Sequence, residues 1–206
     1  SNYFRALYQG SIGHRDREKA FGASRLYLRL FCCGGDTMPL VRAYLALGSN
    51  LGDRLAQMQA ALERLTQQPA LKVVQVSPVY ENRAVGMGEV DDFLNAIAAV
   101  DTSLGPLDLL DRCLTVESEL GRVRSGQWAP RTIDLDVIAY GEASIDHERL
   151  QLPHPRIEER DFVLHPLHAL APELRIRGQR VADLASILSM DELTLRSCEL
   201  RLPSVD

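Results

Sequence analysis

The sequence has almost no lysine: of its 23 basic residues, 21 are arginines and only Lys19 and Lys72 are lysines. A Walker phosphate-binding loop requires Gly-x-x-x-x-Gly-Lys followed by Ser or Thr, and neither lysine stands in such a run. The dinucleotide-binding pattern Gly-x-Gly-x-x-Gly is also absent. If a nucleotide binds, arginines and metal ions must hold its phosphates. Arginine suits this task because its planar fork grips phosphate bidentately, although a coding preference for arginine would give the same excess.

Long apolar runs and ordered cysteine patterns are missing as well. No run approaches the roughly 18–20 apolar residues that a membrane-crossing helix needs. The four cysteines show neither metal-ligand spacing nor a disulfide framework, which is typical of a reduced compartment. The formal net charge of -5 argues against the broad basic surface of a nucleic-acid-binding protein. We therefore expect a cytoplasmic protein without membrane or nucleic-acid partners, and we take it to be a monomer.

The first 37 residues differ from the rest of the chain. They mix arginine, glycine and serine without a sustained period, and six basic residues stand against three acidic ones. We interpret residues 1–37 as an N-terminal extension of uncertain order and residues 38–206 as one catalytic domain.

From Val41 onward the pattern is regular. Apolar residues alternate from Val41 to the turn at Gly48-Ser49-Asn50 and again at 132–140, while 71–80 is rich in valine and 93–100 is an apolar run, which predicts four strands. Helices are expected after Asp53, which can act as an N-cap, at 106–121 between Pro106 and Gly121, and at 181–188. A short hairpin is expected around Gly141, and 152–160 is punctuated by prolines. The order strand-helix-strand, twice, predicts an α+β sandwich of the ferredoxin-like, split-βαβ kind, with an antiparallel or mixed sheet flanked by helices.

Two aspartates interrupt the fourth predicted strand. Because successive side chains of a strand point to opposite faces, Ile133, Leu135 and Val137 share the buried face. Asp134 and Asp136 share the other. Aspartate is a poor strand former, so two of them in an otherwise apolar strand need a reason. Converging carboxylates can bridge two magnesium ions, although a solvent-facing strand would show the same alternation.

Charged residues surround this pair in the sequence. The arginines are Arg122, Arg124 and Arg131 before it and Arg149, Arg156 and Arg160 after it. Loops that fold over the strand ends would bring several forks to a triphosphate, although each arginine alone is commonly a solvated surface residue.

Glu117 falls inside the apolar stripe of the helix predicted at 106–121. The expected stripe consists of Leu110, Cys113, Leu114 and Leu120. A charge there needs a partner or a polar cavity, unless it snorkels at the margin of the stripe.

Two aromatic residues and an amide could hold a flat heterocycle. Phe93 and Asn95 share one face of the third predicted strand, and Phe162 lies in the proline-rich region. Core packing is the more common role of phenylalanine. His154, between two prolines, is held in a stiff loop and could contact phosphate.

At these residues the sequence resembles the 6-hydroxymethyl-7,8-dihydropterin pyrophosphokinases of folate biosynthesis. The matching runs are Ala46-Leu-Gly-Ser-Asn-Leu-Gly-Asp, Ser77-Pro-Val-Tyr, Asp92-Phe-Leu-Asn, Glu117 through Gly-Arg-Val-Arg, Trp128-Ala-Pro-Arg-Thr-Ile-Asp-Leu-Asp and Leu152-Pro-His-Pro-Arg. The resemblance spans residues 41–174. It implies that the substrate hydroxyl attacks the β-phosphorus of ATP and that AMP leaves.

The resemblance also implies roles for individual residues. Two magnesium ions would be held by Asp134 and Asp136, and Arg122 and Arg131 would join them in catalysis. The implied nucleotide contacts are Glu117, Arg122, Arg124, Trp128, Arg131, Arg149, His154 and Arg160. The implied pterin contacts are Phe93, Asn95 and Phe162, together with Asn82 and Val85 in the 81–92 loop, which lacks the Thr-x-Pro element common in the family.

Two alternatives stay open on the residues alone. One is a different two-metal, ATP-dependent phospho- or nucleotidyltransferase without pterin specificity. The other is a ferredoxin-like nucleic-acid module, which would want exposed aromatics with basic neighbours on the sheet.

Overall fold

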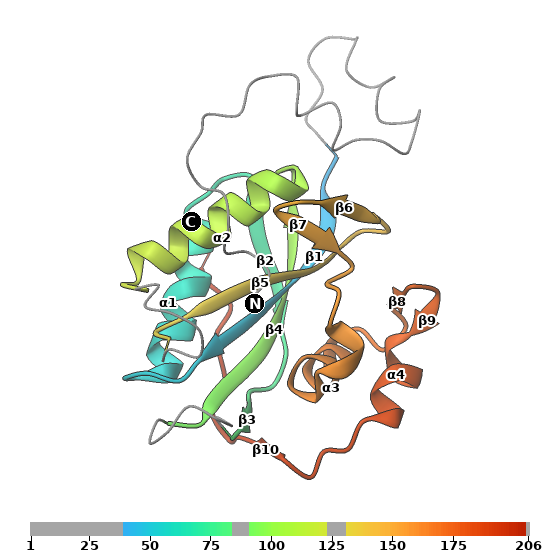
Figure 1. Ribbon diagram of the computed structural model, residues 1–206. Helices are drawn as coiled ribbons and strands as arrows, with labels where there is room; N and C mark the ends of the chain where they lie inside the picture. Colours follow the sequence, from blue (N-terminus) through green and yellow to red (C-terminus); the bar gives the residue numbers. More distant parts are fainter. Residues whose placement is uncertain (1–38, 84–90, 123–130, 205–206) are drawn as a thin grey trace.

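In the part of the chain that the computed structural model describes, residues 39–83, 91–122 and 131–204, six strands form one antiparallel sheet. They are β1 (Val41–Ser49), β2 (Leu71–Val76), β3 (Tyr80–Asn82), β4 (Phe93–Thr102), β5 (Asp134–Tyr140) and β10 (Leu193–Leu195). The strand order is β10-β3-β4-β1-β5, and β2 also pairs with β4. The sheet therefore has β1 and β4 at its centre and β5 at one edge (Figure 1).

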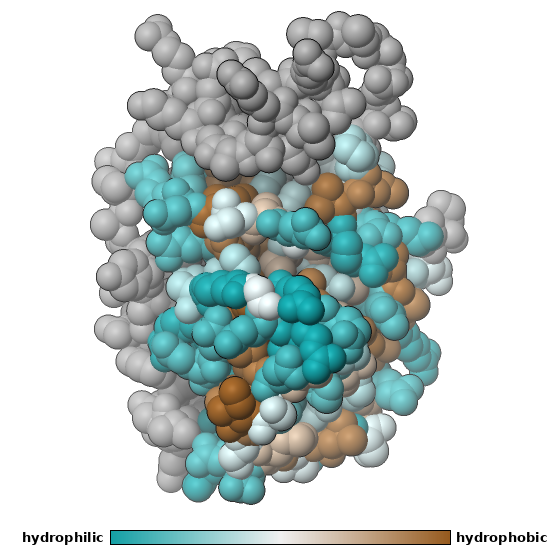
Figure 2. All heavy atoms as spheres, turned by 90° about the vertical axis from the view of Figure 1, so that its right-hand side faces the viewer, coloured by the Kyte–Doolittle hydropathy of each residue, from teal (hydrophilic) through white to brown (hydrophobic). Residues whose placement is uncertain are grey.

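Helices cover both faces of this sheet (Figure 1). α1 (Arg54–Thr66) and α2 (Pro106–Glu119) lie on one face, and α3 (Asp161–Leu170) and α4 (Val181–Ile187) lie on the other. The units β1-α1-β2 and β4-α2-β5 are two split βαβ motifs. The α+β, ferredoxin-like fold expected from the sequence is confirmed. The outer side of α3 and α4 is largely hydrophilic, with separate apolar patches rather than one continuous surface (Figure 2).

Local sequence signals begin and end the first two helices as expected. The carboxylate of Asp53 accepts a hydrogen bond from the Ala56 N–H at 3.0 Å, which caps α1. Pro106 occupies the first turn of α2, where its missing N–H costs no helical bond. Gly121 follows α2 with φ +76°, a conformation that glycine adopts without a steric penalty.

Two apolar cores lie on opposite faces of the sheet, and a β-bulge in β5 serves both. Leu45 pairs with Val137 and Tyr44 with Ala139, so Ile138 is an extra residue. Ile138 and Ala139 both join the core beneath α3 and α4, whereas Val137 joins the core beneath α1 and α2.

The single strand predicted at 71–80 is wrong, because the chain breaks it into β2 and β3. Ser77 lies between them and its hydroxyl accepts from the Ile97 N–H at 2.9 Å, while the Ser77 N–H donates to the Ile97 carbonyl at 2.8 Å. A side chain thus takes the place of a backbone acceptor in the ladder. Pro78, which has no N–H, follows directly and cannot resume regular pairing.

Helix α3 was not predicted, and Phe162 was expected in a proline-rich region rather than in a helix. Residues 161–170 form a helix in which Pro166 is buried. The helix is retained because Val163, Leu164 and Leu167 lie in the second core, so tertiary packing outweighs the helix-breaking tendency of proline.

The remaining elements are short. They are the hairpin β6 (Ile145–His147) and β7 (Leu150–Leu152), the 3-10 turn η3 (Ile157–Glu159), and the pair β8 (Arg175–Ile176) and β9 (Gln179–Arg180). The hairpin follows the turn at Gly141, as expected. Among the described residues, no helix combines the length and apolar character needed to span a bilayer. The extension interpreted at 1–37 lies outside them.

Candidate active site

Asp134 and Asp136, the acid pair, lie on the face of the sheet that the sequence predicted. Ile133, Leu135 and Val137 are at most 3% exposed in the first core, and the intervening Asp134 and Asp136 point to the opposite face. In the ladder, the two aspartates lie opposite Gly48 and Ala46 of β1. The pair therefore projects from the edge strand onto the face that also carries α3.

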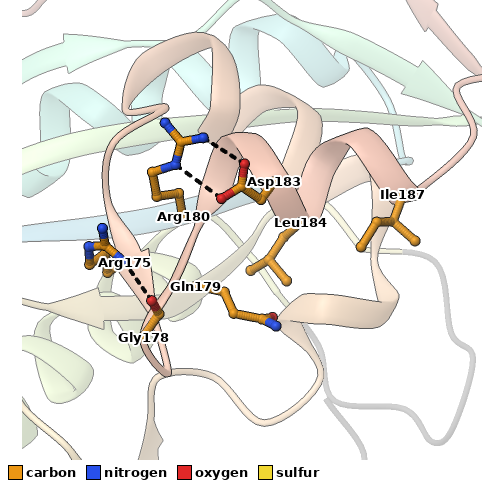
Figure 3. A pocket seen from close by; sticks show the side chains of 7 residues that line it. All are labelled: Arg175, Gly178, Gln179, Arg180, Asp183, Leu184 and Ile187. Carbon is orange, nitrogen blue, oxygen red and sulfur yellow. Dashed lines mark hydrogen bonds and ion pairs between the residues drawn. The ribbon is translucent and has the colours of Figure 1, made fainter.

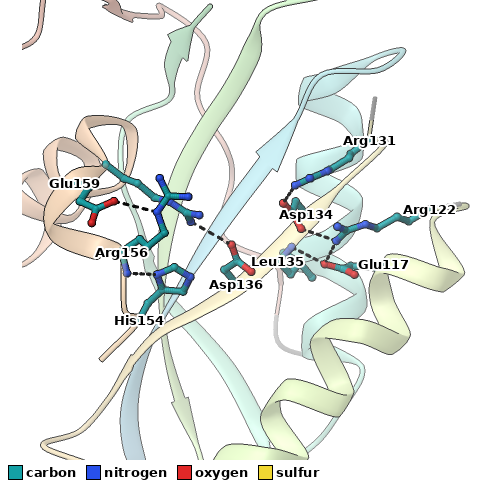
Figure 4. A network of polar contacts seen from close by, with 10 residues as sticks. Glu117, Arg122, Arg131, Asp134, Leu135, Asp136, His154, Arg156 and Glu159 are labelled. Atoms are coloured by element: carbon teal, nitrogen blue, oxygen red, sulfur yellow. Dashed lines mark hydrogen bonds and ion pairs between the residues drawn. The ribbon is translucent and has the colours of Figure 1, made fainter. Parts of the chain in front are cut away.

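Asp134 is held by two arginines, as Figure 4 shows. Arg122 Nη1 contacts one carboxylate oxygen and Arg131 Nη1 contacts the other. Burial alone would raise the pKa of Asp134, but the two guanidinium groups outweigh it and hold the pKa below its usual value. Asp134 is thus a carboxylate that stays ionised in the fold.

Glu117 is buried, with 2% exposure, so the snorkelling interpretation is wrong. Its carboxylate accepts from the Leu135 N–H at 2.8 Å and forms an ion pair with Arg122. Burial raises the pKa of Glu117 to about 7, although Arg122 opposes the shift. The apolar stripe of α2 also differs from the prediction: its buried members are Leu109, Cys113 and Val116, which places Glu117 within the stripe.

The end of α2 brings Arg122 back onto Glu117. Gly121 N–H donates to the Ser118 carbonyl at 3.1 Å, and Arg122 N–H donates to the Glu117 carbonyl at 3.0 Å. These bonds, together with the left-handed conformation of Gly121, form the reversal that closes many helices. The glycine therefore positions the guanidinium group as well as ending the helix.

Asp136 lies in a different electrostatic environment. Its nearest cation is Arg160, whose Nη1 is 3.7 Å from the carboxylate. Burial and the neighbouring Asp134 raise the pKa of Asp136, and Arg160 opposes them. The Arg160 guanidinium also lies 5.8 Å from the centroid of the Phe162 ring, so it connects the acid pair to α3.

Gly48 lies between the acid pair and two amide side chains, Asn82 and Asn95, which form the amide pair. It lies opposite Asp134 of β5 on one side and Asn95 of β4 on the other. A Cβ at this position would be 3.5 Å from Asn95 Oδ1, 3.9 Å from Asp134 Cβ and 4.0 Å from Phe93 Cδ1. Asn95 Nδ2 donates to Asn82 Oδ1 at 2.7 Å. Phe93, Asn95 and Asn82 are therefore gathered next to the carboxylates, as their predicted shared role requires.

The sequence analysis missed two residues that fix the approach to β5. The Ser49 hydroxyl donates to the Thr132 carbonyl at 2.6 Å. Asn50 Oδ1 accepts from the Arg131 N–H at 2.7 Å, and the Asn50 N–H donates to the Arg131 carbonyl at 3.1 Å. Both side chains are at most 1% exposed. Their position after a strand gave only a turn signal, since the partners are about eighty residues away.

His154 is a neutral histidine beside the arginines. Its Nδ1 accepts from the Arg156 N–H at 3.2 Å, so in the neutral ring the proton is on Nε2. Burial and the nearby Arg160, Arg156 and Arg177 lower its pKa to about 3. The ring can therefore donate one hydrogen bond to an anion without carrying a charge.

The histidine gives the fold a pH dependence. Because the folded-state pKa lies below the usual value, the neutral ring contributes stability that is present above about pH 6.5 and is lost as pH falls toward about 3. His154→Asn keeps an acceptor at the Nδ1 position. We expect the melting temperature of this variant to fall less between about pH 7 and pH 4 than that of the parent protein. Thermal unfolding across this range checks it. His168→Asn, at an exposed position of α3, is the control and should follow the parent curve.

Not every predicted site residue joins these contacts. Arg149 lies on the turn between β6 and β7, where it forms an ion pair with Asp111 of α2. Arg124, Trp128 and Val85 lie outside the described residues. Within those residues, three or more metal-binding side chains do not gather at one point, so a metal ion would rely on the two aspartates.

A surface pocket elsewhere is not this site. It is lined by Arg175, Gly178, Gln179, Arg180, Asp183, Leu184 and Ile187, at the β8-β9 turn and α4 (Figure 3). Its arginines are already engaged: Arg180 is 2.7 Å from Asp183, and Arg175 donates to the Gly178 carbonyl at 2.7 Å. The pocket shares no residue with the acid-pair network.

Comparison with known proteins places this site in a family. The sequence model of 7,8-dihydro-6-hydroxymethylpterin-pyrophosphokinase matches residues 44–172. A protein of Methylorubrum extorquens named 2-amino-4-hydroxy-6-hydroxymethyldihydropteridine pyrophosphokinase is 48% identical over 144 residues, which cover 70% of this chain and 91% of that protein. The protein of the same name from Pseudomonas aeruginosa is 47% identical over 139 residues, covering 68% and 86%.

A solved structure supports the fold. A crystal structure of Plasmodium falciparum HPPK-DHPS with pterin and p-hydrobenzoate has a TM-score of 0.59 at 15% identity. The match covers 74% of this chain and 45% of that one, so the chain spans less than half of that protein. Together with the ordered motifs and their convergence on one face of the sheet, the sequence matches show that the chain belongs to the 7,8-dihydro-6-hydroxymethylpterin-pyrophosphokinase family.

Proposed function

We propose that this chain transfers the pyrophosphoryl group of ATP to 6-hydroxymethyl-7,8-dihydropterin and releases AMP, a step of folate synthesis. The names of its relatives support the activity. The structural observation that supports it most directly is the placement of the acid pair next to the Asn82–Asn95 amide pair, across Gly48. One face of the sheet thus offers adjacent places for a phosphate chain and for a polar heterocycle.

Two magnesium ions are part of the proposal, and the residues present fit them. Magnesium is commonly held by one or two carboxylates together with substrate phosphates, rather than by an all-protein cage. Asp134 and Asp136 supply such a pair on one face of β5. When bound, the ions would neutralise phosphate charge and align the reacting oxygens.

The cationic residues around the pair would bind the triphosphate. Arg122 and Arg131 lie at Asp134, and Arg160 lies at Asp136. His154 would add a neutral hydrogen-bond donor. Glu117 would act on the nucleotide mainly by orienting Arg122, because its carboxylate is buried against the Leu135 N–H. Arg124, Trp128 and Arg149 complete the proposed nucleotide contacts.

The amide and aromatic residues would bind the pterin. Asn95 presents both a donor and an acceptor, and its link to Asn82 fixes the orientation of the amide. Phe93 lies beside Gly48, and Phe162 lies beside Arg160. The two aromatic rings are proposed to stack on the flat heterocycle. We propose Val85 as a further contact. The hydroxymethyl arm would cross Gly48 toward the phosphates.

In the reaction, the alcohol oxygen forms a bond to the β-phosphorus. The bond between that phosphorus and the oxygen shared with the α-phosphate breaks, AMP leaves with the bond electrons, and the alcohol loses its proton. The protein contributes position and compensating charge rather than a covalent nucleophile. Arg122 and Arg131 are held beside Asp134 in this structure, and they would stabilise the developing charge once their contacts pass from that carboxylate to the phosphates.

Three further features are part of the proposal. A single catalytic domain at 38–206 is supported by two cores that share one sheet and by the family match at 44–172. A cytoplasmic location is supported by the absence of a disulfide pattern among the cysteines. The third feature is a monomeric state.

Product identification tests the activity. The protein is mixed with ATP, magnesium and 6-hydroxymethyl-7,8-dihydropterin, and the products are separated and identified by mass spectrometry. AMP and a pterin pyrophosphate in equal amounts are expected. ADP with a pterin monophosphate would instead indicate the transfer of a single phosphoryl group and would reject the proposal.

A further inference from the structure

A C-terminal strand outside the residues of the family match is paired with the pterin side of the site. β10 lies antiparallel to β3, with Leu193 opposite Asn82 and Thr194 opposite Glu81. The family match ends at residue 172. The Arg196 N–H extends this pairing by donating to the Val79 carbonyl at 2.9 Å. The end of the chain therefore forms the outer edge of the sheet beside Asn82.

Glu81 joins this strand to two other segments. One carboxylate oxygen contacts Arg196 Nη1 at 3.1 Å, and the other contacts Arg54 Nη1 at 2.8 Å. The Glu81 side chain is 17% exposed and that of Arg54 23%, so solvent screens this pair less than it screens ordinary surface pairs, whereas the Arg196 side chain is 46% exposed. Arg54 Nη1 also donates to the Asp92 carbonyl at 2.6 Å. Glu81, Arg54 and Arg196 together form a charge clamp.

The charge clamp holds the two chain segments that carry the proposed pterin contacts. Glu81 directly precedes Asn82, and Asp92 directly precedes Phe93. Asn82 in turn accepts the hydrogen bond from Asn95. A shift of β3 relative to β4 would therefore move the amide pair, whereas the aspartates on β5 lie two strands away across β1.

We propose that Arg196 and Glu81 are positioning residues for pterin binding: the C-terminal strand, through the charge clamp, stabilises the end of the β3–β4 ladder, where Asn82 lies opposite Phe93. This inference rests on the proposed function. It predicts that weakening the clamp changes the use of pterin and leaves the use of ATP unchanged.

Arg196→Ala tests the inference in the full-length chain. The backbone bond from residue 196 to Val79 remains possible, so the variant removes the guanidinium group while the strand can stay paired. We expect the KM for the pterin to rise about fivefold, while the KM for ATP and kcat change less than about twofold. Arg196→Lys, which keeps a charge near Glu81, should recover most of the loss. Glu81→Gln should match or exceed the effect of Arg196→Ala, because it weakens both ion pairs.

Arg201→Ala is the matched control. Arg201 is exposed in the same C-terminal segment, its backbone is bonded to Gln59, and its loss changes the net charge equally. Its pterin KM should equal that of the parent. An unchanged pterin KM in Arg196→Ala, an equal rise in both KM values, or the same rise in Arg201→Ala would overturn the inference. Since the parent enzyme must first form AMP and pterin pyrophosphate, failure of the proposed function is recognised separately, before any variant is compared.

Discussion

Asp136→Ala is expected to reduce magnesium-dependent AMP formation at least about a thousandfold, because one of the two carboxylates proposed to hold magnesium is lost. The fold should survive. Burial and Asp134 raise the pKa of Asp136, so removing this carboxylate relieves an unfavourable charge. The substitution also removes the favourable 3.7 Å contact to Arg160. The two effects on stability oppose each other, so the melting temperature should move by only a few degrees. Steady-state assays of AMP and thermal unfolding give the two measurements.

A carboxylate elsewhere on the same sheet provides the control. Asp101 of β4 is paired with Arg42 at 2.6 Å and belongs to neither the acid pair nor the amide pair. Asp101→Ala should keep near-parental turnover. Titration calorimetry with magnesium and a non-hydrolysable ATP analogue should show that Asp136→Ala loses metal binding and that Asp101→Ala retains it. Parental turnover in Asp136→Ala would remove this residue from the metal site.

Arg122→Ala should have the second large effect, on both stability and catalysis. The substitution removes the ion pair between Arg122 and Glu117, which is 2% exposed. Removing one partner of a buried ion pair typically costs about 3 kcal/mol. Turnover should fall about a hundredfold or more. Arg122, which contacts Asp134, is also the cation proposed to stabilise the phosphates, and the substitution removes it. Urea unfolding and AMP formation measure the two losses.

A double variant separates the two losses. Glu117→Gln added to Arg122→Ala removes the charge of the buried carboxylate, and the amide oxygen of the glutamine can still accept from the Leu135 N–H. Stability should return toward the parental value while turnover stays low. If turnover recovered together with stability, Arg122 would have only a structural role and its assignment to the phosphates would be wrong.

The sequence predicted those parts of the site that depend on local patterns. Strand alternation placed Asp134 and Asp136 on the face opposite Leu135, and the structure has this arrangement. Capping chemistry located the ends of α1 and α2 at Asp53 and Gly121. These signals were sufficient because each depends on a few neighbouring residues. The roles of the site residues toward substrates stay predictions.

The sequence could not predict features that depend on distant partners. Ser77 breaks a strand because its hydroxyl meets the Ile97 N–H, and Asn50 acts on Arg131 across eighty-one residues. The helix α3 escaped notice because Pro166 obscures its pattern until the second core is assembled. Such effects come from tertiary packing, which overrides local propensity.

The extra residue at Ile138 restricts how β5 can change in length. With the present register, the aspartates face the site while Ile138 and Ala139 both fill the second core. Deleting Ile138 would remove the bulge and leave Val137 opposite Leu45 and Ala139 opposite Tyr44, so both aspartates would keep their face. Deleting Leu135 while the following residues kept their partners would instead turn Asp134 into the apolar layer under α2. Changes of length between Asp134 and Val137 should therefore be far less tolerated than changes at Ile138 or in the β6–β7 hairpin that follows.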